Sequence, residues 1–219
     1  MGLRARLRLG HYRRGGGDLV TTLPEKFETC VAAKFPLITI AVNNARHLVN
    51  IALIGFMGTG KTSVGRLVAE QLRFEYLDTD ELIQTNTGRS ITDIFAKDGE
   101  PAFRALEQKV VEELAGRKNT VISTGGGLPV NPKNLASLKT HALVVSLWSA
   151  PEKIWERVRH QSHRPLLHDE NPQAKIRELL AAREPFYKQA DVLLNTDLRS
   201  VREVAQQVVH QFRLEASRR

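Results

Sequence analysis

From residue 49 onward, the chain alternates between short apolar runs and longer segments in which apolar residues recur at helical spacing. The uninterrupted runs predict buried strands, and spacing such as Val64, Leu67, Val68 and Leu72 predicts amphipathic helices. Strands are expected at residues 49–54, 74–77, 120–123, 142–147 and 192–194. Helices are expected at residues 61–72, 80–84, 92–97, 101–115, 132–139, 151–160, 172–183 and 201–214. This alternation predicts an α/β fold, a three-layer sandwich with a mainly parallel central sheet.

The first 49 residues differ from the rest. They contain eight basic and three acidic residues, and so account for +5 of the formal net charge of +8. The start, through residue 17, is rich in Arg and Gly, which predicts an unstructured extension; a targeting segment and a partner-binding arm are the alternatives. Residues 35–42 are compatible with a short strand. We therefore divide the chain into a basic extension, residues 1–49, and one domain, residues 50–219.

The composition excludes several classes of protein. Hydrophobic residues make up 42% and charged residues 26%, as in globular proteins, and the single Cys30 excludes a disulfide framework or a cysteine-based zinc site. No apolar run approaches the roughly 18 residues of a membrane-spanning helix. Most of the excess positive charge lies in the extension, which lacks the two adjacent amphipathic helices of a helix-turn-helix. We therefore expect neither a membrane nor a nucleic acid as partner.

A phosphate-binding pattern follows the first predicted strand. Residues 55–62, Gly-Phe-Met-Gly-Thr-Gly-Lys-Thr, match G-x-x-x-x-G-K-[ST] between a strand and a helix. Glycines let the backbone turn tightly and aim N–H groups at phosphate oxygens, and the helix start favours anions. Lys61 can reach the β- and γ-phosphates, and the Thr62 hydroxyl can ligate Mg²⁺. A chance glycine-rich turn is the alternative. We expect ATP at residues Gly58, Thr59, Gly60, Lys61 and Thr62.

Acidic residues and glycines follow the next two predicted strands. Asp78 and Asp80 stand at the carboxyl end of strand 74–77, where open α/β sheets bind ligands. Asp78 can hold Mg²⁺ through water, and Asp80 can bind acceptor hydroxyls; an ordinary pair of helix N-caps is the alternative. Residues 124–127, Thr-Gly-Gly-Gly, follow strand 120–123 and allow a ligand close to the backbone, or simply form a flexible turn.

Arginines provide the remaining candidates. Arg104 and Glu107 lie three residues apart on one predicted helix and can form an ion pair. Arg164 stands in the polar stretch 161–171, predicted to be a mobile loop that can close over phosphates. Arg183 ends a helix and can bind a carboxylate through two hydrogen bonds. Taken alone, each arginine is more typical of a solvated surface position.

Together these segments resemble the shikimate kinase family. The resemblance runs from residue 50 to residue 214 and rests on GFMGTGKT, DTD, SITDIF, GEPAFRALE, STGGG, RPLL and REPFY, in the family's order. It implies a P-loop fold like that of nucleoside monophosphate kinases. It also implies transfer of a phosphoryl group from ATP to the 3-hydroxyl of shikimate, in chorismate biosynthesis, by a cytoplasmic monomer with one Mg²⁺ per active site.

The resemblance further implies a role for individual residues. Lys61, Asp80 and Arg164 would act in phosphoryl transfer, with Asp80 orienting the attacking hydroxyl or accepting its proton. Arg157 would stack on adenine, and Arg164 would close over the phosphates from a lid at residues 161–171. Thr62 and Asp78 would serve Mg²⁺. The shikimate site would consist of Asp80, Phe95, Phe103, Arg104, Glu107, Gly126, Gly127 and Arg183.

Within that site, Arg104 and Arg183 would clamp the shikimate carboxylate, supported by the N–H groups of Gly126 and Gly127. Glu107 would hold Arg104, while Phe95 and Phe103 would pack against the ring. Near the adenine pocket, residues 195–197 are Asn-Thr-Asp where the family more often has Asp-Thr, and its usual proline is absent. A kinase for another small metabolite, such as gluconate, and a non-catalytic sensor fused to a DNA-binding segment are the alternative functions.

Overall fold

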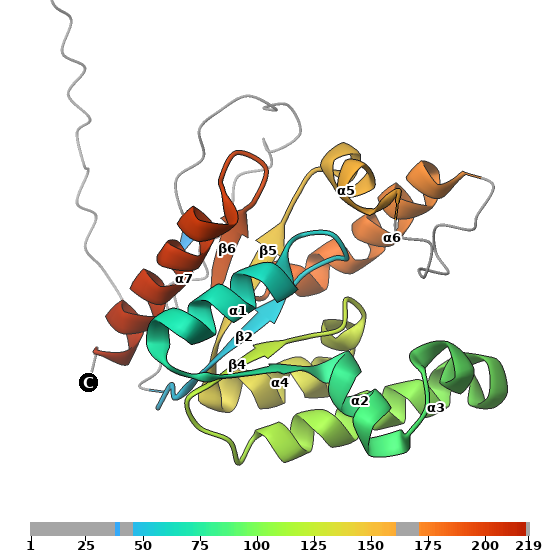
Figure 1. Ribbon diagram of the computed structural model, residues 1–219, viewed down its shortest axis with the longest axis horizontal. Helices are drawn as coiled ribbons and strands as arrows, with labels where there is room; N and C mark the ends of the chain where they lie inside the picture. The colour runs from blue at the N-terminus through green and yellow to red at the C-terminus, as the bar shows by residue number, and fades with distance from the viewer. Residues whose placement is uncertain (1–37, 40–45, 161–170, 218–219) are drawn as a thin grey trace, which may run out of the picture. The chain divides into compact units, whose positions relative to one another are not determined.

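The computed structural model describes residues 38–39, 46–160 and 171–217, in which helices cover both faces of one sheet (Figure 1). The predicted lid and most of the predicted extension lie outside these residues. The strands are β1 (Ile38–Thr39), β2 (Asn50–Ile54), β3 (Glu75–Asp78), β4 (Thr120–Ser123), β5 (Ala142–Trp148) and β6 (Val192–Asn195). The helices are α1 (Lys61–Leu72), α2 (Thr79–Thr87), α3 (Ile91–Leu114), the 3₁₀ helix η1 (Leu128–Val130), α4 (Pro132–His141), α5 (Pro151–Val158), α6 (Pro172–Tyr187) and α7 (Val201–Ala216).

The sheet has the strand order β1-β6-β5-β2-β4-β3, and its five longer strands are parallel. Only β1, within the stretch that is compatible with a strand, pairs antiparallel, with β6. The predicted α/β sandwich with a mainly parallel sheet is therefore confirmed. Leu53 of β2 pairs with Ser123 of β4, which pairs with Asp78 of β3. The segments that follow these three strands consequently start side by side at the carboxyl edge of the sheet.

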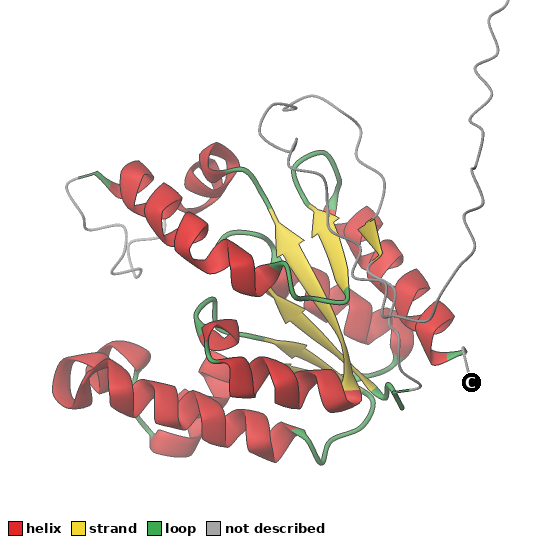
Figure 2. Cartoon of the chain, turned by 180° about the vertical axis from the view of Figure 1, so that it is seen from behind, coloured by secondary structure: helices red, strands yellow, loops and turns green. Residues whose placement is uncertain are grey.

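Alternation along the buried strands divides the core into two layers. In β2, Ile51 and Leu53 pack with α1 and α7, whereas Ala52 and Ile54 pack with α3 and α4 on the other face. All four side chains are fully buried. Each large aliphatic side chain contributes roughly 1.5–3 kcal/mol when it leaves water. Figure 2 shows the same layers from behind, with helices on both sides of the strands. This packing holds the central strand, and the loop after it, in place.

Most helix ends differ from the predicted bounds by a few residues, and the differences at two helices have a clear physical cause. The predicted helices 92–97 and 101–115 are the two parts of α3, which is interrupted at Gly99, where φ is 78° and ψ is 175°. Helix α6 was expected to end at residue 183, before Pro185, but continues through that proline to Tyr187. Proline removes one backbone donor and usually ends a helix, so its presence within α6 misled the prediction. The extra turn brings Tyr187 to the candidate site.

Contacts with the sheet begin before residue 50. Arg46 forms an ion pair with Asp191 over 2.8 Å, and Leu48 is buried at 7% exposure. The Val49 N–H donates to the His141 carbonyl over 3.0 Å. The division of the chain at residue 49 remains a prediction, because residues 1–37 and 40–45 are not described. None of the described helices is long and apolar enough to cross a membrane.

Candidate active site

The phosphate loop connects β2 to α1 at the carboxyl edge of the sheet. Gly55, Gly58 and Gly60 have φ values of 135°, 73° and 93°, which side chains other than glycine's rarely tolerate. The Lys61 ammonium donates to two carbonyl oxygens of the loop, those of Gly55 and Phe56, over 2.9 Å each. Lys61 therefore lies across the loop, where the oxygens of a phosphate can replace these carbonyls as partners of the ammonium group.

Three consecutive glycines, residues 125–127, follow β4 and each faces a different candidate residue. If each glycine carried a Cβ, the nearest side-chain atoms would be, in order, Asp80 Oδ1 at 2.6 Å, Arg183 Nη1 at 3.6 Å and Arg104 Nη1 at 2.6 Å. These side chains come from α2, α6 and α3. Because these three residues have no Cβ atom, three side chains fit beside one backbone segment. The sequence suggested a different use for the same space, the close approach of a ligand to the backbone.

Arg104 is held by acidic residues of its own helix. It pairs with Glu107 over 2.7 Å, as predicted, and also with Glu100 over 2.6 Å. The Glu107 side chain is only 1% exposed, and its Oε1 has no hydrogen-bond partner in the described residues. Burial raises the pKa of Glu107, while the hydrogen bond and charge of Arg104 oppose this rise. The Phe103 ring lies 4.7 Å from the Phe95 ring, which is 40% exposed.

Asp78 combines two of the interpretations offered by the sequence. Its Oδ1 accepts the Asp80 N–H over 3.0 Å, so it is indeed the N-cap of α2. Its Oδ2 accepts the Tyr76 hydroxyl over 3.4 Å. Burial raises the pKa of Tyr76, and hydrogen bonds with Ser123 and Thr62 partly offset that rise. The Asp78 carboxylate and the Thr62 hydroxyl both act on this phenol, and carboxylate and hydroxyl oxygens are ligands that suit a small, hard cation.

Magnesium at this position would take its other ligands from water and phosphate. No group of three or more His, Cys, Asp or Glu side chains in the described residues is arranged to hold a metal ion. Mg²⁺ commonly binds through one or two protein oxygens and completes its shell with water and substrate phosphates. The residues present thus fit the cation, which Thr62 and Asp78 would hold beside the phosphate loop.

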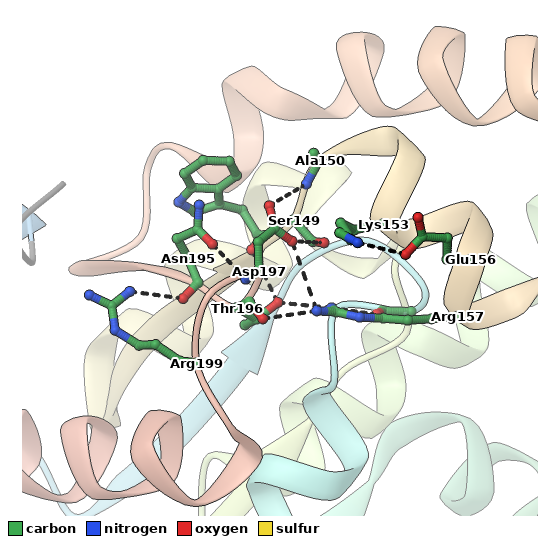
Figure 3. A network of polar contacts seen from close by, with 11 residues as sticks. Ser149, Ala150, Lys153, Glu156, Arg157, Asn195, Thr196, Asp197 and Arg199 are labelled. Carbon is green, nitrogen blue, oxygen red and sulfur yellow. Dashed lines mark hydrogen bonds and ion pairs between the residues drawn. The ribbon is translucent and has the colours of Figure 1, made fainter. Parts of the chain in front are cut away.

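Arg157 connects the phosphate loop to the segment after β6 (Figure 3). Its guanidinium donates to the Gly58 carbonyl over 3.2 Å, and to the hydroxyl and carbonyl oxygens of Thr196 over 3.0 and 2.8 Å. Asp197 accepts hydrogen bonds from the Ser149 hydroxyl and from the backbone N–H of Ala150, the residue before α5. The guanidinium of Arg157 is therefore held by hydrogen bonds along its edge. Its stacking on adenine remains a prediction.

The structure brings most of the predicted site residues to one edge of the sheet. Arg164 lies outside the described residues, and its role stays a prediction. Sequence reasoning missed Thr79, whose buried hydroxyl accepts the Gly125 N–H over 2.9 Å, and Tyr187, whose hydroxyl donates to the Gly126 carbonyl. Both stand inside motifs that were recognised, the DTD and REPFY segments. Neither contact could be predicted, because each partner is more than 40 residues away in the chain.

A parallel sheet, a phosphate loop after its central strand and acidic residues after a neighbouring strand define the class of P-loop kinases. The model of one family in this class, described as shikimate kinase, matches residues 57–213. The chain belongs to the shikimate kinase family.

Individual relatives agree with this assignment. A shikimate kinase from Thermodesulfovibrio yellowstonii is 42% identical over 163 residues, which cover 74% of this chain and 94% of that protein. A shikimate kinase from Caldanaerobacter subterraneus is 44% identical over 163 residues, with 74% and 95% covered. The match therefore includes nearly the whole length of both relatives, and about a quarter of this chain has no counterpart in them.

Solved structures give the same result. A shikimate kinase from Acinetobacter baumannii, in complex with shikimate, is 41% identical with a TM-score of 0.73, over 78% of this chain and 96% of that one. A gluconokinase from Sinorhizobium meliloti has a TM-score of 0.51 over 78% of this chain and 95% of that one, but only 16% identity. That second likeness shows a shared fold alone.

Proposed function

We propose that the chain transfers the γ-phosphoryl group of ATP to the 3-hydroxyl of shikimate, giving shikimate 3-phosphate and ADP, in the route to chorismate and the aromatic amino acids. The observation that carries this proposal is the convergence of Asp80, Arg104 and Arg183 on residues 125–127. Two guanidinium groups suit one carboxylate, and a carboxylate suits hydroxyls. The related protein with bound shikimate supports the same acceptor.

Binding at this site would orient the acceptor. Arg104 and Arg183 hold the carboxylate of shikimate, with the N–H groups of Gly126 and Gly127 beside them. Phe103, with the exposed Phe95, covers the ring, and Asp80 receives the hydroxyls. Because Glu107 and Glu100 already hold the Arg104 side chain, little rotamer freedom remains to be lost on binding.

The transfer step needs position and positive charge more than covalent help. The 3-hydroxyl oxygen forms a bond to the γ-phosphorus as the bond from that phosphorus to the β–γ bridging oxygen breaks, and ADP leaves. Asp80 orients the hydroxyl and takes up its proton. Lys61 and the loop N–H groups stabilise the negative charge on the phosphates, together with Arg164 of the lid. Thr62 and Asp78 would hold Mg²⁺, which would supply further neutralisation of that charge when bound.

Several finer properties belong to the same proposal. We infer one Mg²⁺ per active site, a monomer in the cytoplasm, no nucleic-acid partner, an extension at residues 1–49 and a lid at residues 161–171. Arg157 would take the adenine side of the nucleotide. The charge distribution supports the absence of a nucleic-acid partner, since the chain after residue 49 carries only +3 of the total of +8.

A substrate comparison tests the proposed function. The purified chain is supplied with Mg-ATP and, separately, with shikimate, gluconate or a nucleoside monophosphate, while ADP release and the phosphorylated product are measured. We expect turnover with shikimate and formation of shikimate 3-phosphate, with no more than background ADP release from the other acceptors. A folded chain that prefers gluconate or a nucleotide as acceptor would contradict the proposal.

A further inference from the structure

Tyr187, the last residue of α6, connects this helix to the glycine run 125–127. Its side chain is buried at 5% exposure, and its hydroxyl donates to the Gly126 carbonyl oxygen over 2.6 Å. A carbonyl can only accept, so the phenolic proton is directed at it. Burial raises the pKa of Tyr187 to about 12, against an opposing influence of Arg183. The hydroxyl therefore keeps its proton, and its donor role, throughout the neutral range.

The carbonyl held by Tyr187 shares a peptide group with the N–H of Gly127. A peptide group is planar and trans, so its C=O and N–H point in opposite directions. Glycines on both sides of this group leave the backbone unusually free to rotate. A hydrogen bond that fixes the carbonyl of Gly126 consequently also fixes the direction of the Gly127 N–H.

Arg183 stands one helical turn before Tyr187 on α6. Its Nη1 would be 3.6 Å from a Cβ on Gly126, and its guanidinium lies over the Phe56 ring, 5.7 Å from the centroid. Because the two residues are four apart in α6, their side chains lie on the same face of the helix. One turn of helix thus carries both an arginine for the carboxylate and the phenol that orients the neighbouring peptide group.

We propose that Tyr187 is a positioning residue for the acceptor: through the Gly126 carbonyl, its hydroxyl aims the Gly127 N–H at the carboxylate that Arg104 and Arg183 bind. This inference rests on the proposed function. It makes Tyr187 a determinant of affinity for a carboxylate-bearing acceptor rather than of phosphoryl transfer itself. In this role the side chain acts on the acceptor carboxylate and not on the phosphates, so the KM for ATP should change little.

Replacement of the phenol by phenylalanine tests the role. In Tyr187→Phe, the KM for shikimate should rise about 3- to 10-fold, the effect of one neutral hydrogen bond. The kcat and the KM for ATP should stay within about 2-fold of the wild-type values. Steady-state kinetics with each substrate varied in turn measures all three quantities, and a thermal melt confirms that the variant is folded.

An acceptor without a carboxylate separates positioning from a general structural defect. The analogue is the cyclohexene triol that lacks the carboxyl group of shikimate, used at high concentration because its binding is weak. If Tyr187 acts on the carboxylate, wild type and Tyr187→Phe should phosphorylate this analogue with kcat/KM values equal within about 2-fold. A loosened site would instead lower kcat/KM for both acceptors to the same extent.

Thr87→Val is the matched control variant. The Thr87 hydroxyl also donates to a backbone carbonyl, that of Ile83, over 2.7 Å in α2, but it contacts none of the proposed site residues. Its loss should leave the KM for shikimate within about 2-fold of the wild-type value. A rise equal to that of Tyr187→Phe would show that the kinetics respond to any lost hydroxyl, and would overturn the role of Tyr187.

The remaining outcomes also decide the question. An unchanged KM for shikimate in folded Tyr187→Phe overturns the inference and leaves the proposed function intact, whereas a wild-type chain inactive on shikimate overturns both. If Tyr187→Phe does not fold, 4-aminophenylalanine at position 187 restores a donor at the same place on the ring. A KM for shikimate within about 2-fold of wild type then supports the role, and a rise of 3-fold or more contradicts it.

Discussion

Asn50 at the amino end of the parallel strands and Glu107 at the carboxyl end are two buried polar side chains that are paired differently. At the amino end, Asn50 of β2 is fully buried and its amide is completely paired. Its Nδ2 contacts the Arg117 carbonyl at 2.7 Å and His141 Nδ1 at 2.9 Å, and its Oδ1 accepts the Thr120 N–H over 3.0 Å. These contacts join the starts of three neighbouring strands without any group from outside the chain.

At the carboxyl end, buried polar atoms are paired only in part. Glu107 is as buried as Asn50, yet one carboxylate oxygen holds Arg104 and the other has no hydrogen-bond partner in the described residues. Arg104 itself is 30% exposed, on the side where residues 125–127 leave space. A buried polar atom without a partner costs free energy, so the Glu107 carboxylate contributes less to stability than the Asn50 amide.

The comparison therefore separates stability from function along the same strands. Substitutions at the amino end should change the free energy of unfolding, and substitutions at the carboxyl end should change the kinetics. The following changes test that separation, beginning with the largest expected effect.

Arg104→Ala should lower kcat/KM for shikimate by about 10²- to 10³-fold, since a charged partner of the carboxylate is lost from a partly buried site. The KM for ATP should stay within about 2-fold of the wild-type value. Arg89→Ala is the control, because Arg89, which lies between α2 and α3, pairs with the partly exposed Asp98 of α3, and such pairs contribute little. An equal weakening of both substrates would show that Arg104 supports the fold rather than the carboxylate.

Gly125→Ala should lower kcat by about 10²-fold. The new Cβ would stand 2.6 Å from Asp80 Oδ1 and 3.2 Å from Glu107 Oε1, so the Asp80 carboxylate must move, and small displacements of reacting groups cost rate. Gly116→Ala is matched to it, since a Cβ there meets only the Glu113 carbonyl at 3.9 Å. Rate measurements at saturating substrate decide; a Gly125→Ala rate near that of Gly116→Ala would place Asp80 outside the chemistry.

Asn50→Ala should reduce the free energy of unfolding by about 2–4 kcal/mol, because it leaves a buried carbonyl and a buried N–H without partners. The kcat of the folded protein should change by less than about 2-fold. Urea titration measures the loss, with Asn86→Ala as control, whose exposed amide makes a single 3.5 Å contact. A large fall in kcat without loss of stability would break the separation between the two ends.

The smallest expected effect is a loss of stability at low pH, which we attribute to His141. Burial lowers the pKa of His141, so the folded chain resists a proton that the unfolded chain accepts below about pH 6.5. Protonation would also place a second donor against the Asn50 amide. Stability should therefore be constant above that pH and fall as the pH decreases below it, by about 1–3 °C in Tm. In His141→Gln this part of the pH dependence should vanish.

The sequence was most informative where structure is local. Helix α1 and strand β4 have the predicted bounds, because periodicity, glycines and turn residues act over a few positions. The pairing of Arg104 with Glu107 followed from helical spacing. In contrast, η1 was not predicted, and the continuation of α6 beyond Pro185 contradicted the usual effect of proline. The last residue of that helix, Tyr187, donates to the Gly126 carbonyl, a contact that no window of sequence contains.

By itself, the sequence determined the alternation of strands and helices, the phosphate loop and the motifs that assign the chain to its family. It also determined that most of the excess charge precedes residue 50. Only the tertiary structure decided which side chain each glycine of the run 125–127 faces, that the Tyr187 hydroxyl donates to the Gly126 carbonyl, and that the Asn50 amide contacts His141. The physical reason is distance along the chain: propensity and periodicity act between neighbours, whereas these contacts join strands and helices that only the packed sheet brings together.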